Sequence, residues 1–231
     1  MRTKNTYGIL GGLGPLASAQ FLLSLYKNVD PVENEQEMPK VVMISDPTFP
    51  DRTTYFLKGF YDEIGSRTES AIRTLLQLGA SHIILCCITL HAIVPFLPRK
   101  LRRRLISLPE AALQEVIRIK QRALLMSTNG TRGLRIFENS PAWKEASSFV
   151  TLPDETDQQE IHKLIYAMKT HFDPTKTQLF LAYLCKKYQV GHLICGCTEF
   201  HLVSTQLKDL DSGPNAIKFI DPLNLVMKQV K

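Results

Sequence analysis

Two cysteines occupy equivalent positions in a short internal repeat of the chain. Residues 82–91 read His-Ile-Ile-Leu-Cys-Cys-Ile-Thr-Leu-His, and residues 192–201 read His-Leu-Ile-Cys-Gly-Cys-Thr-Glu-Phe-His. The two segments align without gaps about half the chain apart, and the alignment places Cys87 opposite Cys197. A segment repeated at this spacing predicts two similar lobes, each with a cysteine where a strand ends and a helix begins.

A pair of thiols in these positions can perform proton transfer on a carbon atom. The free N–H groups of a helix start stabilise a thiolate and lower its pKa. The carboxyl ends of parallel strands are also where α/β proteins bind ligands. Cys87 and Cys197 would then face each other across the cleft between the lobes, where one takes a proton and the other returns one. Cys86, Cys185 and Cys195 are better explained as small buried apolar residues.

Two other uses of these residues are open but weaker. A zinc site could use His192, Cys195, Cys197 and His201, although C-x-C is a poor spacing for zinc ligands. A cysteine hydrolase could use as its base the histidine four residues after either cysteine. A hydrolase, however, has no reason to carry the pair twice.

The first glycines of the chain resemble part of a nucleotide-binding motif. Gly12, Gly14 and Ala17 have the G-x-G-x-x-A spacing after a predicted strand. Pro15 removes an N–H from the phosphate-binding turn, and Asp46 lies farther along than the roughly 20 residues expected of the ribose-binding acid. A nucleotide-binding oxidoreductase would explain these glycines and nothing else, so we favour close approach of the backbone to a small ligand.

Short apolar strands alternate with helical segments along the whole chain. This alternation predicts an α/β fold of two pseudo-symmetric lobes, each with a mostly parallel sheet of about four strands flanked by helices, and an active site in the interlobe cleft. The expected strands are 7–10, 40–45, 81–86, 122–127, 149–152, 192–196 and 217–220. The expected helices are 17–28, 62–78, 88–97, 132–139, 156–171, 176–188, 199–208 and 222–230.

The composition limits the class of protein and its partners. With 231 residues, 44% hydrophobic and 22% charged, the chain reads as globular, which excludes a disordered, collagen-like or coiled-coil protein. A net charge of +6 suits an anionic substrate. The basic run 99–104 lacks interleaved aromatic residues, so we expect a solvated crossover or a partner contact and no nucleic acid.

The same composition gives an expected location. The apolar runs are shorter than the roughly 20 residues that span a bilayer, so no membrane partner is expected. Five cysteines, an odd number that includes an adjacent pair, indicate a reducing compartment. With no signal peptide before the first strand, we expect a cytoplasmic protein.

Seven short motifs are spread over almost the whole chain. They read Gly11-Gly12-Leu13-Gly14-Pro15-Leu16-Ala17-Ser18, Pro50-Asp51-Arg52-Thr53, Cys87-Ile88-Thr89-Leu90-His91, Leu125-Met126-Ser127-Thr128-Asn129-Gly130-Thr131, Ile165-Tyr166-Ala167-Met168-Lys169, Gly196-Cys197-Thr198-Glu199 and Ile220-Asp221-Pro222. Together they resemble the pyridoxal-phosphate-independent aspartate/glutamate racemase family, and its aspartate racemase branch in particular. Any one of these motifs alone would be weak.

This resemblance implies a racemase with two acid/base thiols, Cys87 and Cys197, and no cofactor or metal. Arg52 and Lys169 would hold the distal carboxylate of the substrate, which agrees with the pairing of a planar guanidinium with a carboxylate. The other implied site residues are Thr89, Thr131 and Thr198 as substrate-binding residues and Glu199 in a supporting position.

Ile88 departs from the family pattern, which has Asn after the first cysteine. That Asn is expected to hydrogen-bond the α-carboxylate end of the ligand, and Ile has no group to do so. Either the backbone N–H groups at the two helix starts and Thr131 hold the α-carboxylate, or activity is weakened or redirected. On this reading, Ile88→Asn should leave the fold intact and tighten binding.

We therefore expect cofactor-independent racemisation of L- and D-aspartate by a homodimer that takes a small dicarboxylic amino acid. A glutamate or broad-specificity racemase, and a catalytically weakened amino-acid-binding homologue that Ile88 would explain, are the alternatives. The expected lobes are residues 1–98 with 208–231, and residues 99–207. The family implies this return of the C-terminus to the first lobe.

Overall fold

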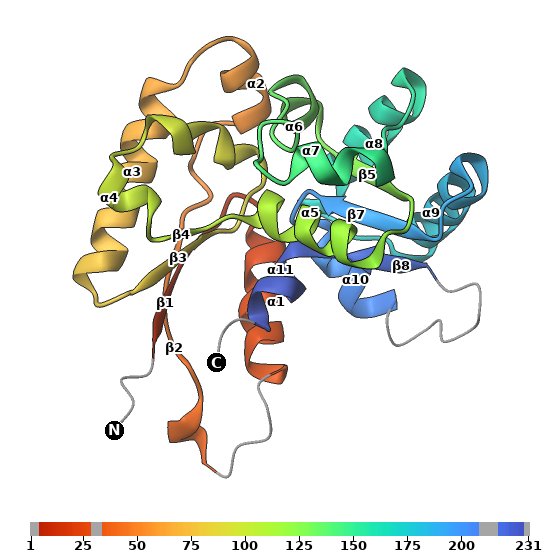
Figure 1. The fold of residues 1–231 in the computed structure, drawn as a ribbon. Coiled ribbons are helices and arrows are strands. Elements are labelled where there is room, and N and C mark those ends of the chain that lie inside the picture. Colours follow the sequence, from red (N-terminus) through yellow and green to blue (C-terminus); the bar gives the residue numbers. More distant parts are fainter. Residues whose placement is uncertain (1–4, 29–33, 208–216, 229–231) are drawn as a thin grey trace.

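The computed structural model describes residues 5–28, 34–207 and 217–228. They form two four-stranded sheets with the orders β2-β1-β3-β4 and β6-β5-β7-β8, and all neighbouring strands are parallel (Figure 1). The strands are β1 (Thr6–Gly11), β2 (Lys40–Ser45), β3 (His82–Leu85), β4 (Leu105–Ile106), β5 (Ala123–Ser127), β6 (Val150–Thr151), β7 (His192–Gly196) and β8 (Lys218–Ile220). The two sheets have the same topology, so the predicted α/β fold of two similar lobes is confirmed.

The helices form layers on both faces of each sheet. They are α1 (Pro15–Lys27), α2 (Arg52–Leu57), α3 (Asp62–Gln77), α4 (Arg99–Arg102), α5 (Leu108–Ile119), α6 (Asn129–Gly133), α7 (Trp143–Ala146), α8 (Glu155–Met168), α9 (Pro174–Tyr188), α10 (Phe200–Leu207) and α11 (Pro222–Met227), with the 3₁₀ segments η1 (Glu35–Glu37), η2 (Thr89–Phe96) and η3 (Ser147–Phe149). Among the described helices, none is both long enough and apolar enough to cross a membrane.

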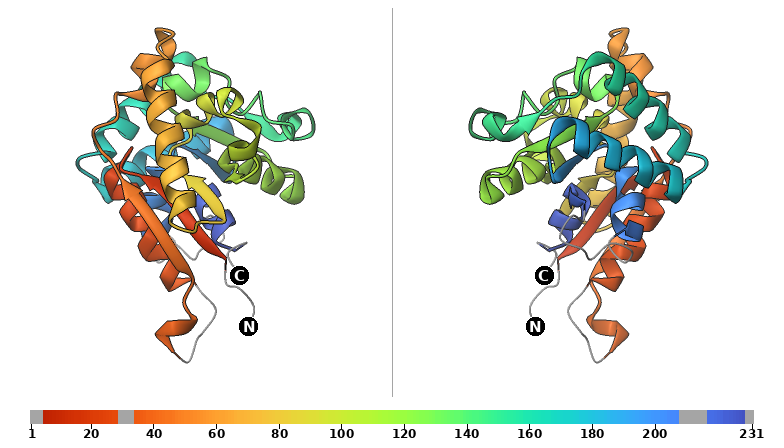
Figure 2. Two further views of the ribbon diagram at one scale, coloured as in Figure 1. Left: turned by 90° about the vertical axis from the view of Figure 1, so that its left-hand side faces the viewer. Right: turned by 90° about the vertical axis from the view of Figure 1, so that its right-hand side faces the viewer.

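Three apolar clusters hold the layers together. The central cluster joins α1, α5 and α11 to the facing sides of both sheets. In Figure 1, α1 and α11 lie between the two sheets, and Figure 2 shows the molecule from its two sides. A second cluster packs α3 on the outer face of the first sheet, and a third packs α8 and α9 on the outer face of the second. The two lobes therefore share one core.

Strand residues alternate between these clusters with the period of two that a strand imposes. In β1, Ile9 belongs to the central cluster and Leu10 to the outer cluster of the first sheet. In β5, Leu124 belongs to the outer cluster and Leu125 to the central one. Both faces of each sheet are covered, which explains why these strands are continuous apolar runs in the sequence.

The edge strands β4 and β8 each pair across a predicted lobe boundary. β4 pairs with β3 in the first sheet, although its residues fall within the range 99–207 that the sequence predicts as the second lobe. β8 pairs with β7 in the second sheet, although its residues fall within the range 208–231 that the sequence predicts as part of the first lobe. The predicted boundary at residue 208 itself lies outside the described residues. Each edge strand pairs in parallel with the strand that precedes it along the chain, so each half of the chain completes its own sheet.

Candidate active site

Cys87 and Cys197 line the same small cavity between the two halves of the chain. Cys87 follows β3 and Cys197 follows β7, and their side chains are 6% and 5% exposed. The structure thus brings together the two thiols that the internal repeat singled out. The cavity has a volume of about 10 Å³, which is room for about one water molecule.

Arg52 is held rigidly beside Cys87. It is the first residue of α2, and its guanidinium donates hydrogen bonds to the carbonyl oxygens of Leu13 at 2.5 Å and Pro50 at 2.9 Å. Arg52 and Cys87 line the same cavity. Burial by itself would lower the pKa of Arg52, but the charges of Cys87 and Asp51 raise it. The Nε atom of Arg52 is buried without a hydrogen-bond partner.

Lys169 approaches the cavity from the end of α8. Its Nζ lies 4.0 Å from the centre of the Tyr166 ring and 3.8 Å from Oδ2 of Asp51. Tyr166 donates its hydroxyl hydrogen to the same Oδ2 at 2.7 Å. Burial by itself would raise the pKa of Asp51, but hydrogen bonds from Thr54 and Tyr166 lower it below its usual value. Lys169 therefore already faces an anion when no substrate is present.

Three threonines connect the two halves at the back of the site. The hydroxyl oxygen of Thr89 lies 2.9 Å from that of Thr131 and 3.2 Å from that of Thr128. Thr128 caps α6 by accepting a hydrogen bond from the Thr131 N–H. Thr89 and Thr128 line the cavity, whereas the predicted substrate-binding residue Thr131 lies behind them.

Glu199 and Thr198 continue the segment that carries the second thiol. The Cys197 thiol donates a hydrogen bond to Oε2 of Glu199 at 2.8 Å, and Oε1 of Glu199 is buried without a partner. A Cβ atom on Gly14 would lie 2.2 Å from this Oε1, so a side chain at residue 14 would displace the Glu199 carboxylate. Thr198 does not line the cavity, and its hydroxyl lies 3.4 Å from the Cys86 carbonyl oxygen.

The pKa of Cys197 differs from the lowered value that a thiol at a helix start predicts. Burial, and then the negative charge of Glu199, raise the pKa of Cys197 well above the usual thiol value. The prediction of a lowered pKa is therefore wrong for Cys197, because burial and a neighbouring carboxylate outweigh the N–H groups that follow the strand. The pKa of Cys86 and that of Cys195 are also raised well above the usual value by burial.

Three residues in or beside the cavity belong to the sequence motifs, although the sequence predicts no role for them. Asp51 adjoins Arg52, and its carboxylate also caps α2 through the Thr54 N–H at 2.8 Å. Tyr166 holds Asp51, and Thr128 closes the back of the site. The motif Pro50-Asp51-Arg52-Thr53 and the motif that contains Tyr166 and Lys169 were the available signals, but only the fold shows that they meet.

His91 supports the backbone near Cys87. Its Nδ1 lies 3.0 Å from the carbonyl oxygen of Cys87 and 3.1 Å from that of Ile88. Its Nε2 accepts a hydrogen bond from the Leu108 N–H at 3.3 Å, at the start of α5. Burial lowers the pKa of His91 to about 4, so the ring is neutral at neutral pH. Through these contacts His91 connects η2 to α5.

His201, in the half of the chain that carries Cys197, likewise has both ring nitrogens in contact with other groups. Its Nδ1 lies 2.6 Å from Oδ2 of Asp221, and its Nε2 lies 3.0 Å from the Ser24 hydroxyl. All three side chains are at most 2% exposed. Among the described residues, no group of three or more His, Cys, Asp or Glu side chains is placed to hold a metal ion.

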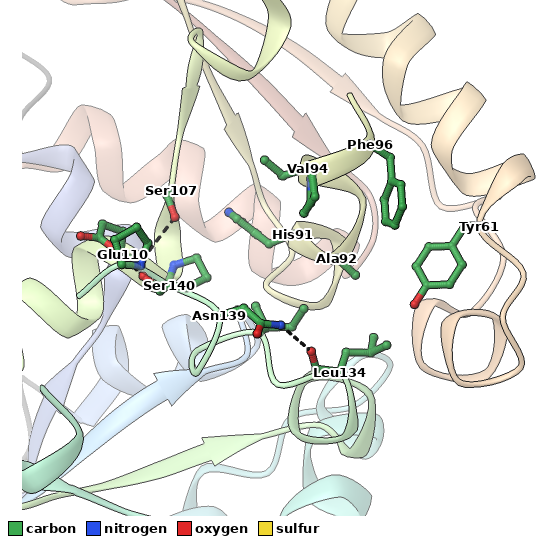
Figure 3. A pocket seen from close by; sticks show the side chains of 14 residues that line it. Tyr61, His91, Ala92, Val94, Phe96, Ser107, Glu110, Leu134, Asn139 and Ser140 are labelled. Atoms are coloured by element: carbon green, nitrogen blue, oxygen red, sulfur yellow. Dashed lines mark hydrogen bonds between the residues drawn. The ribbon is translucent and has the colours of Figure 1, made fainter. Parts of the chain in front are cut away.

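A larger open groove, of about 510 Å³, lies on the surface between the halves. In Figure 3, Tyr61 and Phe96 stand on one side of it, His91 in the middle, and Glu110 with Ser140 on the other side. Glu110 already accepts hydrogen bonds from Ser140 and from the Ala142 N–H. No cysteine is among the described residues that line this groove, so the reactive groups belong to the small cavity.

Ile88 does not line the cavity. Its side chain is fully buried in the central cluster, which also contains Cys86 and Leu108. This position differs from the expectation that residue 88 faces the ligand. Ile88 therefore gives no reason to infer a weakened site.

We expect Ile88→Asn to destabilise the protein rather than to improve binding. The substitution removes a buried apolar side chain and leaves an amide without partners, which together cost about 3 kcal/mol or more. A urea unfolding curve measures the loss, and Ile88→Val, at about 0.5–1.5 kcal/mol, is the matched control. Unchanged stability with tighter aspartate binding would mean that residue 88 reaches the ligand after all.

Residues 10–230 match the sequence family described as Asp/Glu/hydantoin racemase. Because the match extends over almost the whole chain, the chain belongs to this family and is an isomerase of the racemase type.

Solved structures of racemases share the fold. The aspartate racemase of Picrophilus torridus matches with a TM-score of 0.78 at 21% identity, over 98% of this chain and 92% of that chain. A glutamate racemase from Campylobacter jejuni subsp. jejuni matches with a TM-score of 0.61 at 17% identity, over 97% and 84%. The allantoin racemase from Klebsiella pneumoniae matches with a TM-score of 0.60 at 12% identity, over 98% and 86%.

Proposed function

We propose that this member of the Asp/Glu/hydantoin racemase family interconverts L- and D-aspartate without a cofactor. The observation that carries the proposal is the pair Cys87 and Cys197, which come from equivalent positions in the two halves and line one cavity. Two acid/base groups on opposite sides of a substrate carbon are what racemisation by proton transfer requires. The similarity to an aspartate racemase in fold supports the choice of substrate.

In the proposed reaction the two thiols act in opposite senses. One thiolate removes the proton from Cα, and the electron pair of the C–H bond remains on the substrate as a carbanion. The other thiol then donates its proton to the opposite face of Cα. The enantiomer is released, and the two sulfurs have exchanged their protonation states.

The charges around the cavity match an amino acid with two carboxylates. Arg52 and Lys169 supply two cations, and a guanidinium pairs well with a carboxylate. The unpartnered Nε of Arg52 would gain an acceptor when a carboxylate binds. The unpartnered Oε1 of Glu199 offers an acceptor for the α-ammonium group. The hydroxyl groups of Thr89 and Thr128 are placed to hold the α-carboxylate.

Substrate entry requires the cavity to open. A volume of about 10 Å³ holds no amino acid, so side chains that now contact one another must separate. The pair between Lys169 and Asp51 is the contact that a carboxylate would replace most directly, since its 3.8 Å separation is long for an ion pair.

The test is direct assay of the purified protein with each enantiomer. We expect L-aspartate and D-aspartate to reach the same racemic mixture, followed by optical rotation, and to exchange the α-hydrogen in deuterated water. Faster turnover of glutamate than of aspartate would identify the alternative glutamate or broad-specificity racemase. Tight binding of aspartate without exchange would identify a catalytically silent binding protein.

Arg52 is expected to set selectivity for a second carboxylate. Removing a charged hydrogen bond costs about 1.5–3 kcal/mol, so Arg52→Ala should lower kcat/KM for aspartate at least about tenfold. Turnover of alanine, which lacks the distal carboxylate, should fall much less. Steady-state kinetics with both substrates measure the difference.

The matched control removes a cation that faces solvent. The side chain of Lys176 is 86% exposed on α9, and Lys176→Ala should leave kcat/KM for aspartate unchanged. Equal losses for aspartate and alanine in Arg52→Ala would assign Arg52 a structural role only, through its bonds to Leu13 and Pro50.

Assembly and location belong to the same proposal. We propose a homodimer in the cytoplasm that takes a small dicarboxylic amino acid as its ligand. Support for the reducing compartment comes from the cysteines Cys86, Cys87, Cys185, Cys195 and Cys197, all of which are free thiols.

A further inference from the structure

The two halves of the chain hold the backbone carbonyl group of their repeat cysteine in different ways. In the second half, the N–H of Phe200 donates a hydrogen bond to the carbonyl oxygen of Cys197 at 3.2 Å. Leu90 is the residue opposite Phe200 in the internal repeat, so its N–H is the equivalent donor in the first half. Among the described residues, however, no backbone N–H is bonded to the carbonyl oxygen of Cys87. The similarity of the two halves is therefore broken at this bond.

The side chain of His91 supplies the donor that the backbone does not. Its Nδ1 lies 3.0 Å from the carbonyl oxygen of Cys87 and 3.1 Å from that of Ile88, and its Nε2 lies 3.3 Å from the N–H nitrogen of Leu108. A carbonyl oxygen can only accept and a backbone N–H can only donate, so all three contacts require a neutral ring with its hydrogen on Nδ1. The pKa of His91, which burial lowers to about 4, agrees with a neutral ring.

The other end of this connection is firmly held. Leu108 is the first residue of α5, and its side chain is fully buried in the central cluster. The Ser107 hydroxyl caps the same helix by accepting a hydrogen bond from the Glu110 N–H at 3.3 Å. Because α5 packs against α11 and against β7 and β8 of the second sheet, it belongs to the shared core. His91 therefore ties the backbone at Cys87 to a rigid part of the molecule.

The equivalent histidine of the second half has a different use. His201 directs its Nδ1 to Asp221 at 2.6 Å and its Nε2 to the Ser24 hydroxyl at 3.0 Å. In the described part of the chain, neither ring nitrogen contacts the carbonyl oxygen of Cys197, which Phe200 already satisfies. A side chain thus holds the carbonyl group in the first half alone.

We propose that His91 is a positioning residue for Cys87, because it fixes the carbonyl group and with it the direction in which the Cys87 side chain leaves the backbone. For its catalytic meaning this inference rests on the proposed racemisation. A base must be aligned with the C–H bond that it breaks, and a displacement of about 1 Å can cost about 100-fold in rate. His91 is absent from the described residues that line the small cavity, so it acts on the reaction only through Cys87.

The open groove makes His91 reachable from solvent. His91 lines this groove of about 510 Å³ and stands in its middle in Figure 3. The space that His91→Ala leaves should therefore admit a small molecule with the shape of the lost ring. Imidazole has one N–H donor and one nitrogen acceptor, as the His91 ring has. In 1-methylimidazole the acceptor remains and the donor is lost, so the two molecules together test the hydrogen bond to Cys87.

The first experiment follows exchange of the α-hydrogen of L- and D-aspartate in deuterated water by proton NMR. His91→Leu should slow exchange at least about tenfold for the enantiomer whose exchange Cys87→Ser loses, and much less for the other enantiomer. His91→Asn should recover most of this rate, because its amide nitrogen can donate from the position of Nδ1. His192→Leu, at the end of β7 far from Cys197, is the control and should change neither rate.

A purely structural role for His91 predicts other results. Equal losses for both enantiomers in His91→Leu, or equal losses in His91→Leu and His91→Asn, would overturn the proposal. Imidazole should restore exchange in His91→Ala, and 1-methylimidazole should not. Restoration by both molecules would mean that the ring only fills space, and restoration by neither would mean that its hydrogen bonds do not act on Cys87.

Amide hydrogen exchange of the full chain separates this proposal from the proposed function, because it needs no turnover. The Cys87 N–H is bonded to the Leu85 carbonyl oxygen at 2.8 Å, and it should exchange faster in His91→Leu, whereas the Phe200 N–H should not. Unchanged protection at Cys87 would refute the positioning role. Lost protection in a chain that exchanges no aspartate α-hydrogen would refute the proposed function and keep the anchoring by His91. If circular dichroism shows that His91→Leu does not fold, the imidazole series in His91→Ala decides.

Discussion

Cys87→Ser and Cys197→Ser are each expected to abolish racemisation of aspartate. The two-base reaction uses both sulfurs in every turnover, and a serine hydroxyl near neutral pH is a poor substitute for a thiolate base. General acid–base groups contribute about 10²–10⁴-fold to rates, so each loss should be at least about 100-fold. Optical rotation measures racemisation, and proton NMR in deuterated water measures exchange of the α-hydrogen.

The exchange measurement separates the roles of the two thiols. Abstraction from one enantiomer needs only the base on that face, so each variant can still exchange the α-hydrogen of one enantiomer. Cys87→Ser and Cys197→Ser should prefer opposite enantiomers. Near-normal racemisation by either variant would refute the two-thiol mechanism.

The other cysteines provide the controls. Cys185 is half-buried on α9, and Cys195 lies in the outer cluster of the second sheet away from the cavity. Cys185→Ser and Cys195→Ser should affect stability at most. If Cys195→Ser loses turnover and Cys197→Ser retains it, the acid/base residue is Cys195 and not Cys197.

Asp221→Ala is expected to cause the largest loss of stability among the substitutions considered. The carboxylate of Asp221 is 2% exposed and accepts hydrogen bonds from His201 at 2.6 Å, Ser204 at 2.5 Å and the Leu223 N–H at 3.0 Å. Removing one member of a buried polar network costs about 3–5 kcal/mol. For a chain of this size that is a fall in Tm of roughly 10 °C, measured by differential scanning calorimetry.

Asp173→Ala is a closely matched control. Asp173 caps α9 as Asp221 caps α11, and a proline follows each of them. Asp173 is partly exposed and accepts a single capping bond from the Lys176 N–H, so its loss should cost about 1 kcal/mol. Equal losses in the two variants would show that Asp221 acts as a helix cap alone.

The stabilisation by Asp221 should depend on pH in a defined direction. Burial by itself would raise the pKa of Asp221, but the hydrogen bond and charge of His201 lower it below the usual value of 3.8. A carboxyl whose pKa is lower in the folded state stabilises the fold above the unfolded pKa, and this stabilisation is lost as the pH falls through the folded pKa. The difference in unfolding free energy between the unaltered chain and Asp221→Ala should therefore narrow in acid.

The sequence by itself determined the class of fold and the identity of the reactive groups. Strand and helix periodicity is a local property, so the alternation gave a parallel α/β fold without any knowledge of packing. The repeat around Cys87 and Cys197 indicated two similar sheets, because similar local sequences favour similar local structures. Since the carboxyl ends of parallel strands carry the sites of such folds, the two cysteines could be selected from five.

Only the tertiary structure decided which segments meet. The two-residue strand β4 has too few residues to show a period, and the sheet that β8 joins depends on its crossover. Ile88 follows Cys87 directly, but the turn after β3 directs its side chain into the central cluster.

The charges at the two thiols also depend on contacts between distant residues. Arg52 lies 35 positions before Cys87 in the sequence, and no local rule predicts that the two side chains line one cavity. Glu199 is two residues from Cys197, yet whether its carboxylate turns toward the thiol depends on the loop before α10. Electrostatic effects depend on distance and burial, and the folded chain alone sets both.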